Sequence, residues 1–219
     1  MVLPPDPTLD ELRLALAPAV ADAAVFDGWT AAAVDSAADQ LGVARPLAQA
    51  AFADGQMAMI AAWIDGIDAA MGAALPAATL AGLSIRERIR RLVTFRLTAI
   101  AGQREALRRA LAIMAMPQNA AQAVKFGWRS ADAMWRLAGD TATDFNHYTK
   151  RAILGSIYAA TLAVFASDES EGWAETRAFL DRRIEGIIKF EKTKAQWLRP
   201  SEERFSMVRL LGRLRYPAR

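Results

Sequence analysis

The spacing of apolar residues is the feature of this chain that most restricts the folds open to it. Between Leu9 and Phe26, apolar side chains recur every three or four positions, so they gather on one face of an α-helix. This spacing returns along most of the 219 residues, and no stretch shows the alternation of a half-buried strand. Alanine, the strongest helix former, is abundant. The sequence therefore predicts an all-α bundle of about nine or ten helices.

Capping and turn residues divide this pattern into separate helices. Ser84 and Glu87 form a capping box that opens a long helix, Pro117 closes it, and residues 72–82 are predicted to form a loop. The expected helices span residues 9–26, 34–41, 46–54, a segment ending near 71, 85–116, 120–128, 130–138, 144–165, 173–197 and 204–216.

Two scarce residue types exclude several kinds of chemistry. The chain has no cysteine, which removes disulfides, thiolate catalysis and cysteine metal ligands. Its one histidine, His147, cannot supply the two Glu-x-x-His motifs of a di-iron bundle or a usual zinc site. No nucleophile–base pair and no phosphate-binding loop is visible. We therefore expect a protein that is not an enzyme and that carries no metal or other cofactor.

The start of the chain and its most apolar stretch predict a location. Residues 1–6 lack the charged start and apolar run of a signal peptide and are too acidic for a transit peptide. The apolar stretch 57–83 is interrupted by Asp65 and Asp68, so no membrane span is expected. These features predict a cytoplasmic protein.

Charge is distributed unevenly along the chain. Residues 1–83 carry ten acidic side chains and two basic ones, whereas residues 84–109 carry eight arginines against two glutamates. Residues 199–219 carry six arginines against two glutamates. An acidic first part and a basic end imply surfaces that bind different partners.

Residues 9–54 resemble the N-terminal helix-turn-helix domain of TetR-type regulators. The resemblance rests on the turn at 25–30, on Leu41-Gly42-Val43 and on the aromatic Phe52. DNA binding needs basic side chains near phosphates and base-reading groups on the recognition helix. Here that helix, 45–52, offers one arginine and one glutamine, and its acidic surroundings repel phosphate. We expect the fold without nucleic-acid binding; a TetR-like transcriptional regulator with a hydrophobic ligand is the alternative.

The stretch Asp-Phe-Asn-His-Tyr-Thr-Lys-Arg-Ala at 144–152 carries a second resemblance. Together with Met134-Trp135 and the strings within 168–185, it is similar to the Coq-nine family of ubiquinone-biosynthesis accessory proteins, closely over about 120–190 and in helix order throughout. The resemblance implies a TetR-like fold, the binding of isoprenoid lipid, and assistance to the di-iron demethoxyubiquinone hydroxylase.

The helix predicted at 144–165 has two contrasting faces. Its polar and aromatic arc is expected to face solvent or a partner, because the apolar arc opposite must face the core. The family resemblance implies that this surface docks the hydroxylase, although animal members carry tryptophan at the position of His147. An ordinary surface histidine and an acid that favours the helix dipole are the plainer interpretations. The expected partner-binding residues are Asp144, Asn146, His147, Tyr148 and Arg151.

The second half of the chain has an aromatic-rich interior. The end of the same helix is apolar all round, so something must bury it. The plain interpretation is core; the sharper one is a cavity for a quinone or isoprenoid lipid, since such cavities are lined by apolar and aromatic groups. The expected lipid-binding residues are Trp135, Ile157, Tyr158, Leu162 and Phe165.

The basic end of the chain predicts an amphipathic helix at 204–216. Apolar residues occupy one face and arginines lie opposite, which is typical of a helix that lies in a membrane interface. A helix that packs back on the bundle would show the same pattern. The expected membrane-binding residues are Arg204, Met207, Arg209, Leu210, Leu211, Arg213 and Leu214.

The predicted organisation has three parts: a helix-turn-helix-like segment at 1–71, a ligand-binding bundle of the Coq-nine type at 84–198, and the basic tail helix at 200–219. The predicted function is non-catalytic: a homodimer that takes a hydrophobic quinone precursor from the membrane and presents it to the hydroxylase. The predicted location is the inner face of a bacterial cytoplasmic membrane.

Overall fold

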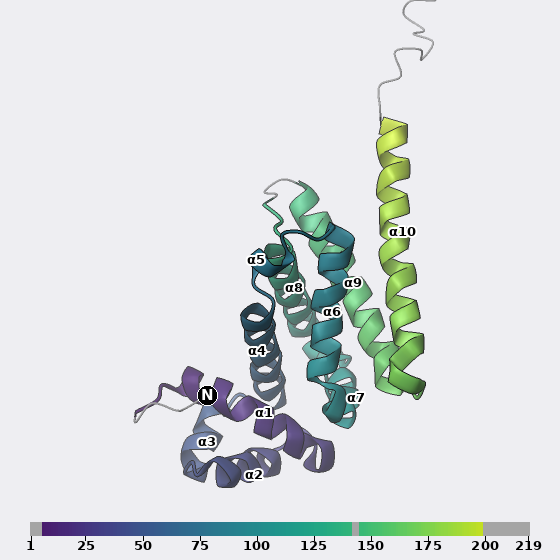
Figure 1. The fold of residues 1–219 in the computed structure, drawn as a ribbon. Coiled ribbons are helices and arrows are strands. Elements are labelled where there is room, and N and C mark those ends of the chain that lie inside the picture. The colour runs from purple at the N-terminus through teal and green to yellow at the C-terminus, as the bar shows by residue number, and fades with distance from the viewer. Residues whose placement is uncertain (1–5, 142–144, 199–219) are drawn as a thin grey trace, which may run out of the picture. The chain divides into compact units, whose positions relative to one another are not determined.

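A computed structural model describes residues 6–141 and 145–198, and within these ranges the chain forms ten α-helices and no strand (Figure 1). This confirms the all-α prediction. The helices are α1 Leu9–Asp27, α2 Ala31–Leu41, α3 Arg45–Ala51, α4 Gln56–Ala74, α5 Ala77–Leu80, α6 Ile85–Ala99, α7 Arg104–Met114, α8 Ala120–Leu137, α9 Phe145–Ser167 and α10 Ala174–Leu198.

Helices α1 to α3 form the helix-turn-helix-like part of the chain. Leu12, Leu16 and Val20 of α1 are buried, and α1 packs on both α2 and α3. Helix α2 ends at Gly42, whose φ of 68° lies in the left-handed region that glycine adopts without strain. The Trp29 indole is buried and donates to the Ala106 carbonyl at 3.0 Å, which fixes this part to α7.

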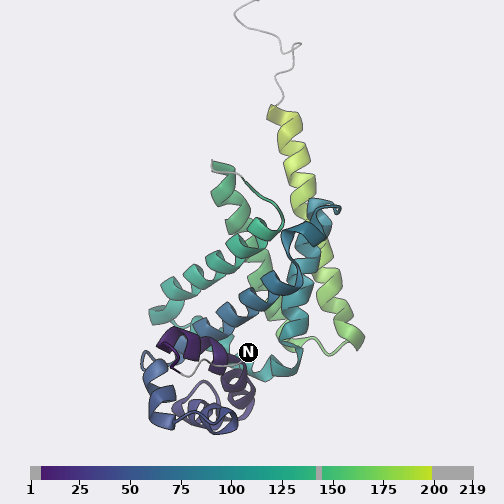
Figure 2. The same cartoon turned by 60° about the vertical axis from the view of Figure 1, so that its left-hand side comes forward.

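Helix α4 joins that part to the remaining bundle. It packs against α1, α6, α7 and α8, and α8 in turn packs against α9. Figures 1 and 2 both show α1–α3 gathered at one end of α4, while the rest of α4 runs among the later helices. By length and hydropathy α4 would allow a membrane span, but here it packs as a core helix with ion pairs to its neighbours.

The centre of the bundle holds a buried ion pair. Arg96 of α6 has a side chain that is only 1% exposed, and it donates to the carboxylate of Asp68 on α4 and, at 3.0 Å, to the hydroxyl of Ser130 on α8. Burial raises the pKa of Asp68, and the Arg96 guanidinium works against that rise. One cluster thus ties three helices together.

Three segments differ from the prediction. The helix expected over 85–116 breaks between α6 and α7, where a short 3-10 turn spans Ala101–Gln103. The break brings Gln103 to the Trp63 indole, from which it accepts a hydrogen bond at 2.8 Å, and to the Asp22 carboxylate, to which it donates at 2.6 Å. These contacts are long-range, so the local pattern does not reveal them.

The two short helices expected at 120–128 and 130–138 are one helix, α8. Ser130 looks like a cap in the sequence, but its hydroxyl accepts from Arg96 and lies 3.3 Å from the Asp68 carboxylate, so it serves the core. The predicted loop at 72–82 also contains the short helix α5.

The described chain divides into two compact units, and the boundary falls within α10, after Arg182. Before it, Asp168 caps the start of α10. Its carboxylate accepts from the backbone N–H groups of Ser170 at 2.9 Å and Thr176 at 2.8 Å, as well as from both hydroxyls. Burial alone would raise the pKa of Asp168, but these hydrogen bonds outweigh it and hold the pKa far below its ordinary value.

We expect Asp68→Ala to lower the free energy of unfolding by about 3–5 kcal/mol, because it leaves the Arg96 charge buried without its counter-charge. Urea unfolding measures this loss. Asp65→Ala is the matched control on the same helix: its pair with Arg129 is partly exposed and is worth under about 1 kcal/mol. Equal losses in the two variants would mean that the Arg96 cluster does not hold the bundle.

Candidate functional site

An apolar cavity lies among α4, α6, α7, α8 and α9 and has a volume of about 260 Å³. Trp63 and Ile67 line it from α4, and Leu111 and Met114 line it from α7. Arg96 forms one polar end, where its guanidinium lies 4.8 Å from the centre of the Tyr158 ring. The wall is otherwise nearly all apolar, which is the chemistry that accepts a hydrocarbon chain.

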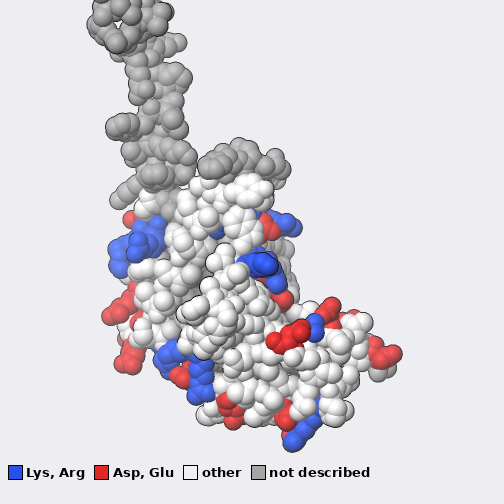
Figure 3. All heavy atoms as spheres, turned by 180° about the vertical axis from the view of Figure 1, so that it is seen from behind, with Lys and Arg blue, Asp and Glu red and all other residues white. Residues whose placement is uncertain are grey.

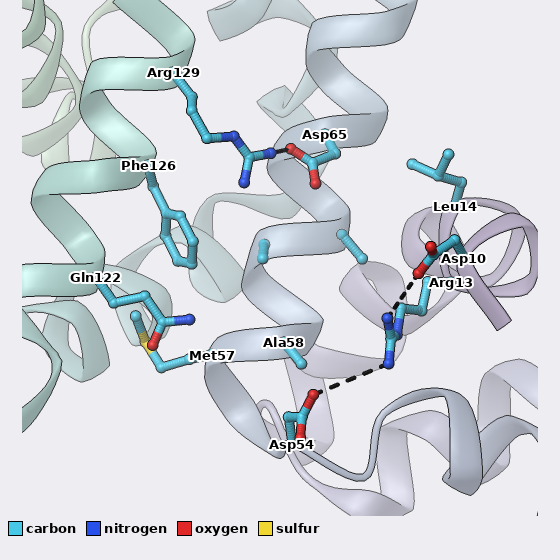
Figure 4. Close-up of a pocket in the computed structure, with 12 residues that line it drawn as sticks. Asp10, Arg13, Leu14, Asp54, Met57, Ala58, Asp65, Gln122, Phe126 and Arg129 are labelled. Atoms are coloured by element: carbon cyan, nitrogen blue, oxygen red, sulfur yellow. Dashed lines mark hydrogen bonds and ion pairs between the residues drawn. The ribbon is translucent and has the colours of Figure 1, made fainter.

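A wider groove of about 620 Å³ lies between α1, α4 and α8 (Figure 4). Its floor is made of small and apolar side chains, among them Leu14, Met57, Ala58, Ala61 and Ala62. Charged side chains surround that floor, so the groove combines an apolar base with a polar rim. This groove has no local sequence pattern, because the residues of its walls come from segments more than 100 residues apart.

The charges of the groove form two groups. Arg129 of α8 pairs with Asp65 of α4 on one side. On the other side Arg13 donates to Asp10 at 2.8 Å and lies 4.0 Å from Asp54. Figure 4 shows the two groups apart from each other, with the α4 helix running between them. The groove thus carries three carboxylates against two guanidinium groups.

Phe126 of α8 lines both the groove and the cavity. Its side chain is 6% exposed, and Figure 4 shows the ring between Gln122 and Arg129, pointing into the groove toward α4. Phe126 is therefore a part of the wall that the two spaces share.

Three aromatic side chains form a cluster between α8 and α9. The Tyr148 ring lies 6.0 Å from the Trp128 ring and 5.2 Å from the His147 ring, centre to centre. Tyr148 is 61% exposed, which is unusual for so large a ring. Exposed aromatic groups of this kind anchor protein–protein interfaces.

Arg151 does not lie on the exposed arc that the sequence predicts for it. Its side chain is 2% exposed and pairs with Asp132 at 2.6 Å and with Asp140 at 3.0 Å. Burial would raise the pKa of Asp140, but hydrogen bonds from Lys150 and Arg151 outweigh it and lower that pKa. Helical periodicity placed Arg151 beside Tyr148, but it could not reveal two carboxylates supplied by other segments.

The other expected partner-binding residues are only partly described. Asp144 lies outside the described residues, and so does the side chain of Asn146, whose backbone belongs to α9. The structure therefore places His147 and Tyr148 together and leaves the extent of the patch around them as a prediction.

The expected lipid-binding residues separate into two groups. Tyr158 and Leu162 line the cavity. Ile157 and Phe165 are buried in the core away from its wall, and Trp135 donates its indole N–H to the Lys150 carbonyl at 3.0 Å. The sequence did not predict that residues of α4 and α7 line the cavity. The one available signal was Asp68 within an apolar helix, which indicates a buried charge that needs a partner.

The arginine and the glutamine of the segment 45–52 both donate to carboxylates. Arg45 donates to Asp39 at 2.8 Å, and this hydrogen bond lowers the pKa of Asp39. Gln49 donates to Asp35 at 2.7 Å. Among the described residues on the face drawn in Figure 3, acidic and basic side chains alternate, and no continuous basic band crosses it.

Two further expectations concern the tail helix and metal binding. The predicted membrane-binding residues at 204–214 lie outside the described residues, so the tail helix stays a prediction. Across the described part of the chain, no three His, Asp or Glu side chains are grouped so as to hold a metal ion.

Comparison with known proteins relates the chain to one family. Residues 120–191 match the COQ9 family. The chain is 33% identical over 176 residues to the mitochondrial ubiquinone biosynthesis protein COQ9 of Rattus norvegicus, a match that covers 77% of this chain and 56% of the relative. It is 31% identical over 176 residues to the protein of the same name from Bos taurus, covering 77% and 55%. The chain spans about half the length of the curated relatives it matches.

A solved structure supports the fold. The chain is similar to the TetR transcriptional regulator from Nitrosomonas europaea ATCC 19718, with a TM-score of 0.62 and 25% identity. The similarity covers 85% of this chain and 98% of that one. Both the TetR-like fold and the resemblance to the Coq-nine family are therefore confirmed.

The predicted location is wrong. The curated relatives from Rattus norvegicus, Homo sapiens and Bos taurus are all named as mitochondrial proteins, which conflicts with a cytoplasmic protein on the inner face of a bacterial cytoplasmic membrane. The charge of the first residues is a local property, and it does not decide where a protein works.

Arg151→Ala is expected to lower the free energy of unfolding by about 3–5 kcal/mol, because Asp132 and Asp140 lose a buried partner. Tyr148→Ala, at an exposed position, should change it by no more than about 0.5 kcal/mol. Urea unfolding compares the two. A harmless Arg151→Ala would show that the buried network does not stabilise the α8–α9 pair.

Proposed function

Since residues 120–191 belong to the COQ9 family and the chain is a homologue of curated COQ9 proteins, we propose that it is a non-catalytic accessory protein of ubiquinone biosynthesis. In this role it binds an isoprenoid quinone precursor and presents it to the di-iron demethoxyubiquinone hydroxylase. The pathway follows from the names of the curated relatives, and lipid presentation to the hydroxylase is proposed in addition.

The cavity is the observation that carries the lipid-binding part. Eight of its lining residues lie within the segment that matches the family, from Ala123 on α8 to Leu162 on α9. Their side chains are mostly apolar, so burial of a hydrocarbon chain there would stabilise the complex by about 25 cal/mol for each Å² removed from water.

The aromatic cluster of Trp128, His147 and Tyr148 supports the docking part. An exposed tyrosine beside a tryptophan offers a large apolar surface, and a tyrosine hydroxyl can make a polar contact with a partner. We assign the hydroxylase to this cluster, with Asp144 and Asn146 as its predicted extension. Arg151 joins α9, which carries His147 and Tyr148, to Asp132 of α8, which carries Trp128.

Membrane contact and dimer formation belong to the same proposal. The tail at 200–219 carries the arginines and leucines of an interfacial helix, which would bring the cavity to a source of lipid. A homodimer is proposed as the working form.

A TetR-like regulator is the second candidate, favoured by the fold of the Nitrosomonas europaea neighbour. The pairing of Arg45 with Asp39 and of Gln49 with Asp35 argues against it, because DNA would have to displace both carboxylates. Retention of a pool of random duplexes at low salt would favour this alternative.

In the source organism, deletion of the gene should lower ubiquinone and accumulate the intermediate that lacks the methoxy group. Lipid chromatography with mass spectrometry measures both, and lipid extracted from the purified protein should include an isoprenoid quinone precursor. A deletion strain with a normal quinone profile would remove the proposed function, whatever the extract contains.

Tyr148→Ala is expected to weaken hydroxylase binding by at least about tenfold, because truncation of an interface anchor costs 1.4 kcal/mol or more. Calorimetric titration of the purified hydroxylase measures the change, and lipid content should be unaltered. Val124→Ala, another exposed apolar residue of the bundle, is the matched control and should bind normally. Loss of lipid together with docking would mean that Tyr148 is structural.

A further inference from the structure

We propose that the groove and the cavity are two parts of one lipid site, joined when Phe126 turns aside, with the apolar chain in the cavity and an uncharged polar head in the groove. This inference rests on the proposed lipid binding and adds a second compartment, a gate and a class of head group.

Volume is the first argument. The cavity holds about 260 Å³, which is below the roughly 300–1,000 Å³ of sites for small ligands. A lipid with both a ring and a long isoprenoid chain therefore does not fit in the cavity alone. The groove adds about 620 Å³ on the other side of Phe126, and its floor of alanine, methionine and leucine side chains continues the apolar surface.

The second argument is the position of Phe126. It is the residue that lines both spaces, and it lies on α8 directly before Gly127, which also lines the cavity. A Cβ at Gly127 would meet nothing within 4 Å, so the cavity wall is open at the residue that follows Phe126. Rotation of this one side chain is the smallest movement that would connect the groove with the cavity.

Charge decides which part of the lipid occupies which space. The cavity is apolar except at Arg96, Ser130 and Tyr158, and Arg96 already has Asp68 as counter-charge. The groove has the polar rim and is the more open of the two. Burial of the hydrocarbon in the cavity and exposure of the head in the groove is therefore the favoured orientation.

The rim of the groove also selects the head. Both guanidinium groups, Arg13 and Arg129, are already paired with carboxylates, and a third carboxylate remains in excess. An anionic head such as a phosphate or a carboxylate would meet a net negative rim. A carbonyl, methoxy or hydroxyl oxygen avoids that repulsion and still accepts hydrogen bonds from guanidinium or amide N–H groups.

Binding of two probes to the full chain tests the proposal: a benzoquinone with a ten-carbon alkyl tail, and an alkyl carboxylate with the same tail. Isothermal titration calorimetry at pH 7 should give a dissociation constant at least about tenfold lower for the quinone. Ala61→Trp, which fills the groove, should raise the quinone's dissociation constant by about tenfold or more. Ala69→Trp is the matched control, since Ala69 is exposed on α4 two turns further along, and it should bind as the wild type does.

The gate has its own readout. Phe126→Leu keeps an apolar side chain but removes most of the ring, so stopped-flow quenching of protein fluorescence should show faster quinone uptake with the dissociation constant little changed. An uptake rate equal to that of the wild type would overturn the assignment of Phe126 as the gate.

The outcomes separate this inference from the proposed function. If the wild type binds neither probe, lipid binding itself fails. Leu111→Trp fills the cavity. If it abolishes quinone binding while Ala61→Trp has no effect, the lipid lies in the cavity alone. That result would contradict the two-part site and would leave the proposed function intact. Equal affinity for the carboxylate would overturn the head-group class. Circular dichroism confirms that each tryptophan variant is folded.

Discussion

The buried pair of Arg96 and Asp68, with Ser130 beside it, is the contact on which the bundle depends. It joins α4, α6 and α8 at the point where the apolar cavity ends, so the same side chains that hold three helices together also shape the ligand space. A buried ion pair adds little stability compared with apolar side chains of the same size. Removal of one partner is strongly destabilising, because the remaining charge is then buried without solvation. The cavity therefore has a rigid polar end and walls of apolar side chains.

The fold could be predicted from the sequence wherever local chemistry determines a helix end. Ser84 caps α6 by accepting from the Glu87 N–H at 3.3 Å, and Gly42 ends α2, both as their spacing predicts. The breaks that were misplaced depend on distant partners. Gln103 is drawn to Trp63 and Asp22, contacts that separate α6 from α7 and that no window of neighbouring residues contains.

The site was predictable to a smaller extent, for the same reason. A long unusual string around Tyr148 carried the resemblance to the Coq-nine family, and helical periodicity placed Tyr148 on an exposed arc of α9. The same periodicity put Arg151 on that arc, although its side chain is buried. Helix geometry determines the direction in which a side chain points, but it does not determine which residues of other segments it meets. Here Asp132 and Asp140 pair with the Arg151 guanidinium, which is buried. A groove walled by segments as distant as Asp10 and Arg129 lies beyond any such pattern.

The hydrogen bonds of Gln103 have a consequence for communication within the molecule. Its amide connects the Trp63 indole, which forms part of the cavity wall, to the Asp22 carboxylate on the first helix. A ligand in the cavity that displaces the Trp63 indole must either break these hydrogen bonds or move the first helix with it. Hydrogen bonds through one glutamine therefore connect the first helix of the helix-turn-helix-like part to the wall of the cavity.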